Sequence, residues 1–164
     1  MKIAVVAYSF EGNTWKIASA IAESIHADLI RLIPQKEMTS TGFSKYIWGG
    51  RQVVFGMKPK IEPLSHDPNQ YDLIFLGSPI WAGTFAPPVK TFLETGLIQE
   101  KAIAYFYTHE GGFKNAVARA QKSIEPDNYL IGSLDLLNVM KNEEQCIQQA
   151  VAWAKEILKQ HSNV

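Results

Sequence analysis

The sequence predicts an α/β protein whose parallel sheet is covered by helices on both faces. Five short apolar segments rich in β-forming residues recur along the 164 residues, and segments of helical periodicity separate them. Strands buried on both faces read as continuous apolar runs. Because crossovers between parallel strands are right-handed, this alternation predicts a doubly wound, three-layer sandwich. The length fits a single domain that spans residues 1–164.

The first half of the chain contains three of the predicted strands. They occupy residues 2–7, 28–33 (DLIRLI) and 71–77 (YDLIFLG), and each is mostly apolar. A helix is expected between the first two, since apolar residues share one face at positions 17, 18, 21, 22 and 25. Residues 36–67 then join the second strand to the third. Apolar residues at helical spacing, followed by prolines, predict a helix and an extended return in this connection.

The second half repeats the alternation of helices and strands. Pro87 and Pro88 begin a helix that continues through Leu93, because proline suits the first helical turn. Strands follow at residues 101–107 (KAIAYFY) and 129–134 (YLIGSL), with a helix over about 113–123 between them. The last helix, about 142–160, has the clearest pattern, with apolar residues at 147, 150, 151, 154, 157 and 158.

Composition excludes several classes of function. Lys and Arg number 16 and equal Asp and Glu, so net charge gives no reason to expect nucleic acid or an anionic membrane as a partner. Cys146 is the only cysteine, and the histidines lack metal-ligand spacing, which argues against a disulfide or a metal cluster. The short apolar N-terminus does not match a signal peptide, and no apolar stretch approaches the roughly 18 residues of a membrane span. We therefore expect a cytoplasmic protein.

Three segments are predicted to lie at the carboxyl edge of the sheet, where doubly wound proteins bind ligands. They are residues 9–14 (SFEGNT), 78–84 (SPIWAGT) and 108–113 (THEGGF). The candidate binding residues in the first segment are Ser9, Glu11, Gly12, Asn13 and Thr14. Those in the second are Ser78, Pro79, Ile80, Trp81, Ala82 and Gly83. Those in the third are Thr108, His109, Gly111, Gly112 and Phe113.

The first segment joins a buried strand to the start of a helix. Unpaired N–H groups and the positive end of the helix dipole suit a phosphate there, and hydroxyl side chains add donors. The same polar residues are equally expected of a turn that simply caps the helix. The spacing matches neither a P-loop nor a Gly-x-Gly-x-x-Gly dinucleotide motif. A receiver domain and a cysteine phosphatase are also excluded, since their acidic residues and cysteine are missing from these positions.

Residues 8–14 (YSFEGNT) resemble the FMN phosphate loop of flavodoxins, and residues 77–84 (GSPIWAGT) resemble their flavin-flanking loop. The resemblance extends over nearly the whole chain. It implies a sheet of order 2-1-3-4-5 and one noncovalent FMN. The second hydroxyl position of the family is Glu11 here. Because a carboxylate repels phosphate by about 1 kcal/mol at 4 Å even in water, we expect Glu11 to turn away and to bond Lys16 or a loop amide.

The resemblance gives roles to the other two segments. Trp81 is expected either to stack on the isoalloxazine or to serve in packing. The peptide between Ala82 and Gly83 is a candidate to turn its carbonyl towards flavin N5, which would separate the two one-electron potentials. Backbone N–H groups of the third segment would bond N1 and O2. His109 would offset the charge of reduced flavin, or be a solvated loop residue.

Three roles are open for the aromatic residues Tyr46, Trp48 and Phe55: part of the core, a cover for the flavin, or a surface that contacts a partner. The resemblance favours an electron carrier that shuttles electrons between a reductase and redox partner proteins. The alternative is an NAD(P)H-dependent quinone or FMN oxidoreductase on the same fold, and a flavin-binding regulatory module is a third class. The protein is expected to be a monomer or a homodimer. For the carrier no residue needs to act as acid or base, because the flavin supplies the redox chemistry.

Overall fold

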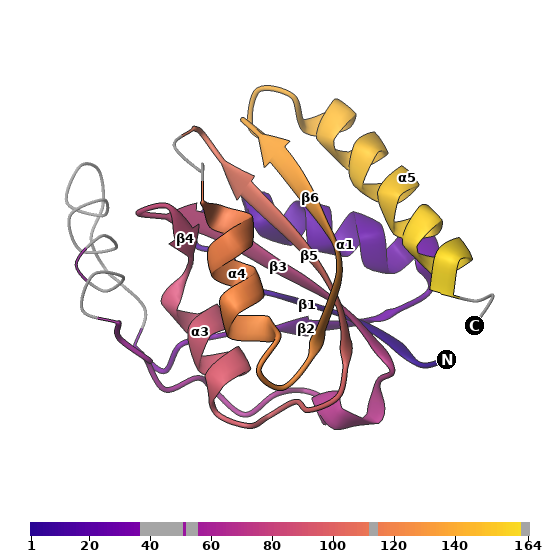
Figure 1. The fold of residues 1–164 in the computed structure, drawn as a ribbon. Helices are drawn as coiled ribbons and strands as arrows, with labels where there is room; N and C mark the ends of the chain where they lie inside the picture. The colour runs from indigo at the N-terminus through magenta and orange to yellow at the C-terminus, as the bar shows by residue number, and fades with distance from the viewer. Residues whose placement is uncertain (37–50, 52–55, 112–114, 162–164) are drawn as a thin grey trace.

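The computed structural model describes residues 1–36, 51, 56–111 and 115–161, and Figure 1 shows a twisted sheet between two layers of helices. The strands are β1 (Ile3–Ala7), β2 (Asp28–Arg31), β3 (Leu73–Trp81), β4 (Thr84–Phe85), β5 (Ala102–His109) and β6 (Tyr129–Leu137). The order is β2-β1-β3-β5-β6, and all four pairings along this path are parallel. This confirms the predicted order 2-1-3-4-5, with the short β4 paired antiparallel to β3 as an addition.

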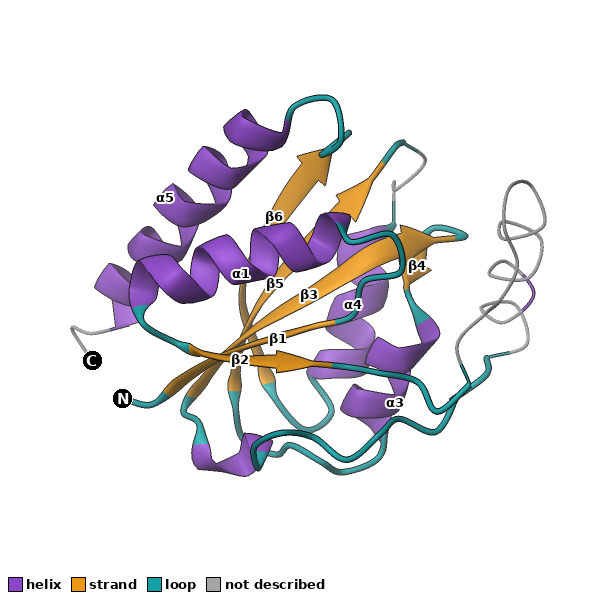
Figure 2. Cartoon of the chain, turned by 180° about the vertical axis from the view of Figure 1, so that it is seen from behind, coloured by secondary structure: helices purple, strands orange, loops and turns teal. Residues whose placement is uncertain are grey.

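Helices cover both faces of the sheet, as predicted. The helices α1 (Asn13–Ile25) and α5 (Glu143–His161) lie on one face, nearer the viewer in Figure 2. The helices α3 (Pro87–Glu94) and α4 (Ala116–Ile124) lie on the other, nearer the viewer in Figure 1. A buried cluster of apolar side chains lies on each side, because successive residues of every strand point to opposite faces. A 3₁₀ turn (Pro68–Gln70) precedes β3.

Two strands continue further than the sequence predicted, and both extensions fall on candidate site residues. Ser78 to Trp81 were expected in a loop but form the last part of β3, and Thr108 and His109 are the last residues of β5. Pairing explains the difference, because Pro79 is in register with Thr108, while Trp81 pairs with Thr84 of β4. Local apolar periodicity ends at Gly77, so these non-local pairings gave no signal in the sequence. The strand β6 likewise continues to Leu137 rather than 134.

The return of the long connection after β2 is extended, as predicted. Gln35 N donates to Lys60 O at 2.8 Å, and Glu62 N donates to Ile33 O at 2.7 Å, around an isolated antiparallel bridge between Pro34 and Ile61. The predicted helix of this connection and the aromatic stretch at positions 46, 48 and 55 lie outside the described residues.

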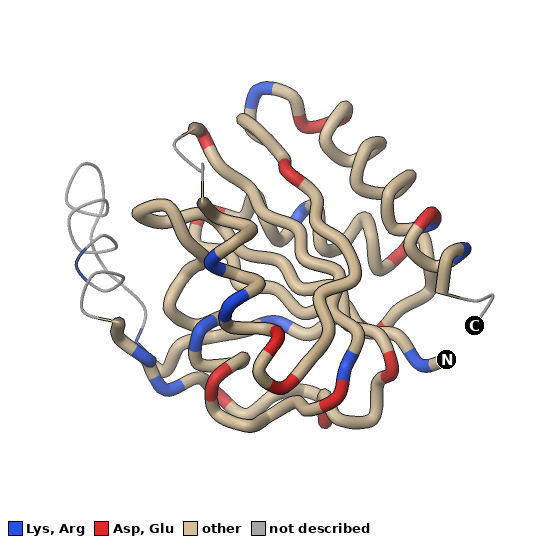
Figure 3. Tube along the Cα trace, viewed as in Figure 1, with Lys and Arg blue, Asp and Glu red and all other residues tan. Residues whose placement is uncertain are grey.

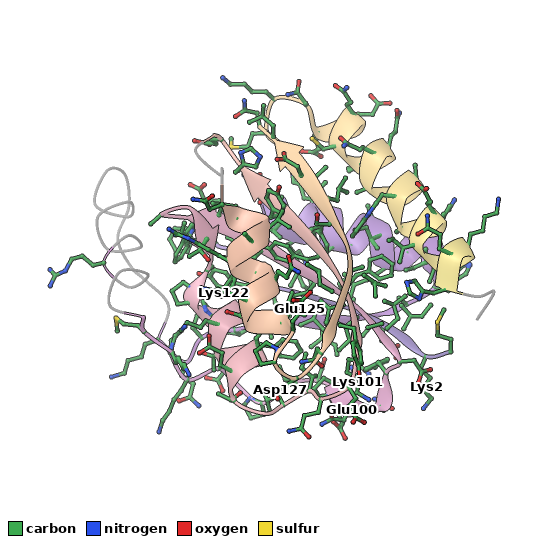
Figure 4. All side chains as sticks on the ribbon, in the orientation of Figure 1. Lys2, Glu100, Lys101, Lys122, Glu125 and Asp127 are labelled. Atoms are coloured by element: carbon green, nitrogen blue, oxygen red, sulfur yellow. The ribbon has the colours of Figure 1, made fainter. Side chains whose placement is uncertain are left out.

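Charged residues surround the edge of the sheet where the strands begin. Figure 4 labels Lys2, Glu100 and Lys101 there, at the opposite end of the strands from segments 9–14 and 108–111. The Lys101 ammonium donates to Asn69 O at 2.7 Å and so ties the start of β5 to the 3₁₀ turn before β3. Figure 3 shows acidic and basic residues interspersed over the surface. No helix in the described part of the chain is long and apolar enough to cross a membrane.

Candidate functional site

The start of α1 presents a cradle of backbone donors at the carboxyl edge of the sheet. Gly12 is the N-cap residue and has a left-handed φ of 94°, and its N–H donates to Ser9 Oγ at 3.1 Å. No side chain caps the helix, and its first turn contains no acidic residue. No described atom lies within 4 Å of the place where a Cβ on Gly12 would stand. The first-turn N–H groups and the positive end of the helix therefore suit an anion.

A buried pair of hydroxyl groups connects this cradle to the third segment. Thr14 Oγ1 and Thr108 Oγ1 lie 2.8 Å apart, and their residues are only 1% and 5% exposed. The pair holds two hydroxyl protons and uses one in the mutual bond, so one O–H donor remains. Ser9 Oγ accepts from Gly12 N, which leaves its own proton to donate. The hydroxyls thus shape the cradle and still offer donors to a bound anion.

The second segment forms a tight hairpin rather than an open loop. Ala82 and Gly83 have φ of 47° and 76°, both left-handed, as a two-residue turn of type I′ between paired strands requires. The Ser78 hydroxyl is fully enclosed and accepts from Ala86 N at 2.9 Å, which fixes the returning arm. The side chain of Ser78 therefore serves the fold, whereas Ala82 at the tip of the hairpin is exposed.

A cation on α4 holds the tip of this hairpin. The Arg119 guanidinium donates from Nη1 to Ala82 O at 3.2 Å. Any rotation of the Ala82–Gly83 peptide that turns this carbonyl elsewhere breaks that bond. Arg119 could not be found from the sequence, because its place next to the turn depends on how α4 packs beside β4.

Trp81 joins the second segment to the first. Its ring meets Tyr8 edge-on at a centroid distance of 5.7 Å and Phe10 at 6.0 Å. Tyr8 is buried, while Trp81 keeps part of its surface exposed at the sheet edge. The packing role that the sequence left open for Trp81 is therefore present, and its exposed part leaves room for a ligand contact.

The third segment begins inside the sheet and contains a buried histidine. His109 is 7% exposed, so it is not the solvated loop residue that the sequence allowed. Its Nε2 lies 2.7 Å from Asp135 Oδ1, and its Nδ1 accepts from Gly111 N at 3.0 Å. Asp135 on β6 was missed by the sequence analysis, although a carboxylate within an apolar strand was a usable signal. Gly112 and Phe113 lie outside the described residues.

Glu11 is exposed, and Lys16 bonds the carboxylate of Glu143 on α5. One of the two partners expected for Glu11 is thus engaged elsewhere. Asn13 begins α1, and Ile80 pairs with Phe85 across the hairpin. Within the described ranges no three His, Cys, Asp or Glu side chains are grouped to hold a metal ion.

The fold and this edge define a doubly wound α/β protein with a candidate phosphate cradle at the strand ends. A family model described as Flavodoxin matches residues 2–152, and the chain therefore belongs to the flavodoxin family. A search of curated proteins found no match.

Solved structures show the same fold. A flavoprotein from Lactobacillus acidophilus, crystallised in complex with FMN, has 26% identity and a TM-score of 0.71, covering 87% of this chain and 97% of its own. A protein from Bacteroides eggerthii superimposes with a TM-score of 0.78 at 23% identity, covering 95% and 97%. Oxidised flavodoxin 2 from Bacillus cereus has a TM-score of 0.60 at 18% identity, covering 98% and 99%.

Proposed function

We propose that the chain binds one FMN at this edge and carries electrons between a reductase and redox partner proteins. The observation that carries the proposal is the start of α1, which no side chain caps and where no described atom lies within 4 Å of a Cβ on Gly12. Ser9 and the Thr14–Thr108 pair add two sources of hydroxyl donors. Membership of the flavodoxin family and the FMN complex of the L. acidophilus relative support the choice of ligand.

The residues present fit a flavin mononucleotide. The N–H groups of α1 and the spare hydroxyl protons would hold the phosphate, since that group needs donors and a positive potential. The exposed part of Trp81, the hairpin tip at Ala82 and Gly83, and the turn after His109 would border the ring system. When bound, FMN supplies the redox chemistry, and the protein supplies binding, orientation and electrostatics.

Binding at the cradle is tested with a matched pair of glycine variants. Gly12 and Gly96 both have left-handed φ, 94° and 71°, and neither has a described atom within 4 Å of a Cβ position. Alanine at either position costs about 1–2 kcal/mol of backbone strain. We expect Gly12→Ala to weaken FMN binding by about tenfold or more, which corresponds to ~1.4 kcal/mol. Gly96 lies beyond the end of α3, so Gly96→Ala should leave the FMN affinity unchanged.

Fluorescence titration of FMN with each variant measures the dissociation constants, and thermal unfolding checks that the two variants are destabilised alike. Equal FMN affinities in the two variants would contradict the placement of the phosphate at the start of α1. Failure of the unmodified chain to retain FMN would overturn the proposal itself.

The carrier role is tested by anaerobic reduction followed by absorbance. We expect dithionite to reduce the loaded protein in two separated one-electron stages, and NADPH or NADH alone to leave it oxidised. Rapid two-electron bleaching by either nucleotide would instead support the NAD(P)H-dependent quinone or FMN oxidoreductase. The reductase and acceptor proteins, the cytoplasmic location and the choice between monomer and homodimer stay predictions.

A further inference from the structure

The contacts of His109 give each of its two ring nitrogens a separate role. A backbone N–H is always a donor, so the 3.0 Å contact from Gly111 N makes Nδ1 an unprotonated acceptor. The ring proton of the neutral imidazole is then on Nε2, which donates to Asp135 Oδ1 at 2.7 Å. His109 therefore connects β6, through Asp135, to the turn that follows β5.

Asp135 is held in place beside this imidazole by a second hydrogen bond. The Tyr107 hydroxyl donates to its second oxygen, Oδ2, at 3.2 Å, and Tyr107 and Asp135 are in register across β5 and β6. Burial first, and then the charge of Asp135 and this bond, raise the pKa of Tyr107 to about 12, so the hydroxyl stays a neutral donor. The Asp135 side chain is 37% exposed, which gives protons a path from solvent.

A second proton on the ring is incompatible with the contact to Gly111. A proton on Nδ1 turns this acceptor into a donor, and the ring N–H would then face the N–H of Gly111. The resulting cation would keep its bond from Nε2 to Asp135 Oδ1. Gly111 has a φ of 133°, and no described atom lies within 4 Å of its Cβ position. The Gly111 backbone therefore has the conformational freedom of glycine to turn away.

We propose that Asp135 and His109 are positioning residues that set the direction of the Gly111 N–H. The neutral imidazole of His109 accepts from the Gly111 N–H at Nδ1. The protonated imidazole releases the Gly111 N–H, which is then available as a donor at the sheet edge. The part that concerns the flavin rests on the proposed function, since the released donor would serve the polar edge of the bound ring system. The switching of Gly111 itself requires no ligand.

Other charged groups on neighbouring elements are engaged elsewhere or exposed. The strand β3 has no titratable side chain within Leu73–Trp81. Arg119 on α4 donates to Ala82 O, and Lys16 on α1 bonds Glu143 on α5. Among the described residues of the adjoining segments, the charged side chains of Glu110, Lys122, Lys141 and Glu144 are exposed, and the buried Cys146 thiol donates to Leu137 O.

The test uses the full chain without FMN and follows two NMR signals from pH 5 to 8, the ring protons of His109 and the amide of Gly111. His109→Gln is the decisive variant, because its amide offers both an acceptor and a donor and does not titrate. Asp135→Asn removes only the charge. Circular dichroism confirms that each variant is folded.

We expect the Gly111 amide to titrate with the imidazole in the native chain and to be independent of pH in His109→Gln. In Asp135→Asn the Gly111 amide should still change together with the imidazole, because the contact from Gly111 N to Nδ1 is retained. A Gly111 amide that ignores the titration of His109, or that responds equally in His109→Gln, would overturn the proposal.

FMN titrations at the two ends of the same pH range then test the ligand part. One released hydrogen bond is worth about 0.5–1.5 kcal/mol, so affinity should rise about two- to tenfold at low pH in the native chain, relative to His109→Gln. The FMN phosphate also titrates in this pH range, but it does so equally with both proteins, so the comparison with His109→Gln removes its effect. Identical pH profiles of affinity would refute the link to flavin. Absence of FMN binding at any pH would refute the proposed function, while the NMR result would still decide the switch.

Discussion

Gly77 lies where β3 reaches the candidate site, and the structure makes a quantitative prediction for its replacement by alanine. A Cβ at this position would stand 2.3 Å from Phe106 Cζ and 2.6 Å from its Cε2, whereas ordinary contact begins near 3.4 Å. Phe106 is fully buried, and Gly77 is paired with Ala7 on one side and with Phe106 on the other. The rigid ring must therefore move by about 1 Å within a close-packed core.

Overpacking of this kind costs about 1–3 kcal/mol. The lower entropy of the unfolded alanine variant offsets about 0.4–1 kcal/mol, because Gly77 has an ordinary φ. We expect Gly77→Ala to lower the free energy of unfolding by about 1–2 kcal/mol, and the melting temperature by about 2–8 °C for a chain of this size.

Gly132→Ala is the matched control. Its Cβ would meet Ile157 Cδ1 at 2.8 Å, but that atom is the end of a flexible side chain on α5 and can rotate away. Urea and thermal unfolding of the FMN-free protein should therefore show a change of less than about 0.5 kcal/mol for this variant. In a Phe106→Leu background the cost of Gly77→Ala should largely disappear, since the ring is gone. Equal stabilities of Gly77→Ala and Gly132→Ala, or an undiminished cost in the Phe106→Leu background, would refute the reasoning.

Three further changes test other parts of the structure. Thr14→Val leaves the buried hydroxyl of Thr108 without its partner, so urea unfolding should show a loss of about 1–3 kcal/mol, and unchanged stability would argue against the bond. Burial, followed by the bond to Asp28, raises the pKa of Tyr71 from 10.0 to about 12. The neutral Tyr71 hydroxyl should therefore contribute fully to the free energy of unfolding below pH 10, and this contribution should vanish as pH rises through 12. Urea unfolding between pH 10 and 12 should show that the free energy of unfolding falls more steeply with pH in the native chain than in Tyr71→Phe. Equal slopes in the two proteins would count against this prediction. Glu11→Gln removes a negative charge near the proposed phosphate, so the FMN dissociation constant should fall by up to about fivefold in low salt, and weaker binding would indicate that the carboxylate is needed.

The order of strands and the face of each helix could be predicted because their signals are local. An apolar run such as 71–77 indicates a strand buried on both faces, whatever its partners are. The periodicity of residues 142–160 likewise indicates the apolar face of α5, which the structure begins at Glu143. The rules for crossovers and for strand ends then place the segments at 9–14, 78–84 and 108–113 on one edge.

The contacts within that edge could not be predicted, since they depend on register between strands that are distant in the chain. The bond between His109 and Asp135 requires β5 and β6 to pair with Tyr107 opposite Asp135, and a slip by one residue would turn the carboxylate to the other face. The hydrogen bond from Arg119 to Ala82 O requires α4 to pack beside the hairpin.

Local patterns were thus enough to predict the architecture, the family resemblance and the three segments of the candidate site. Three features emerge only from the packed fold: Ser78–Trp81 belong to a strand, His109 is buried against a carboxylate, and the Gly111 N–H donates to the His109 ring. Propensity and periodicity act over a few neighbouring residues, whereas hydrogen-bond partners and buried charges are chosen by the packing of whole elements.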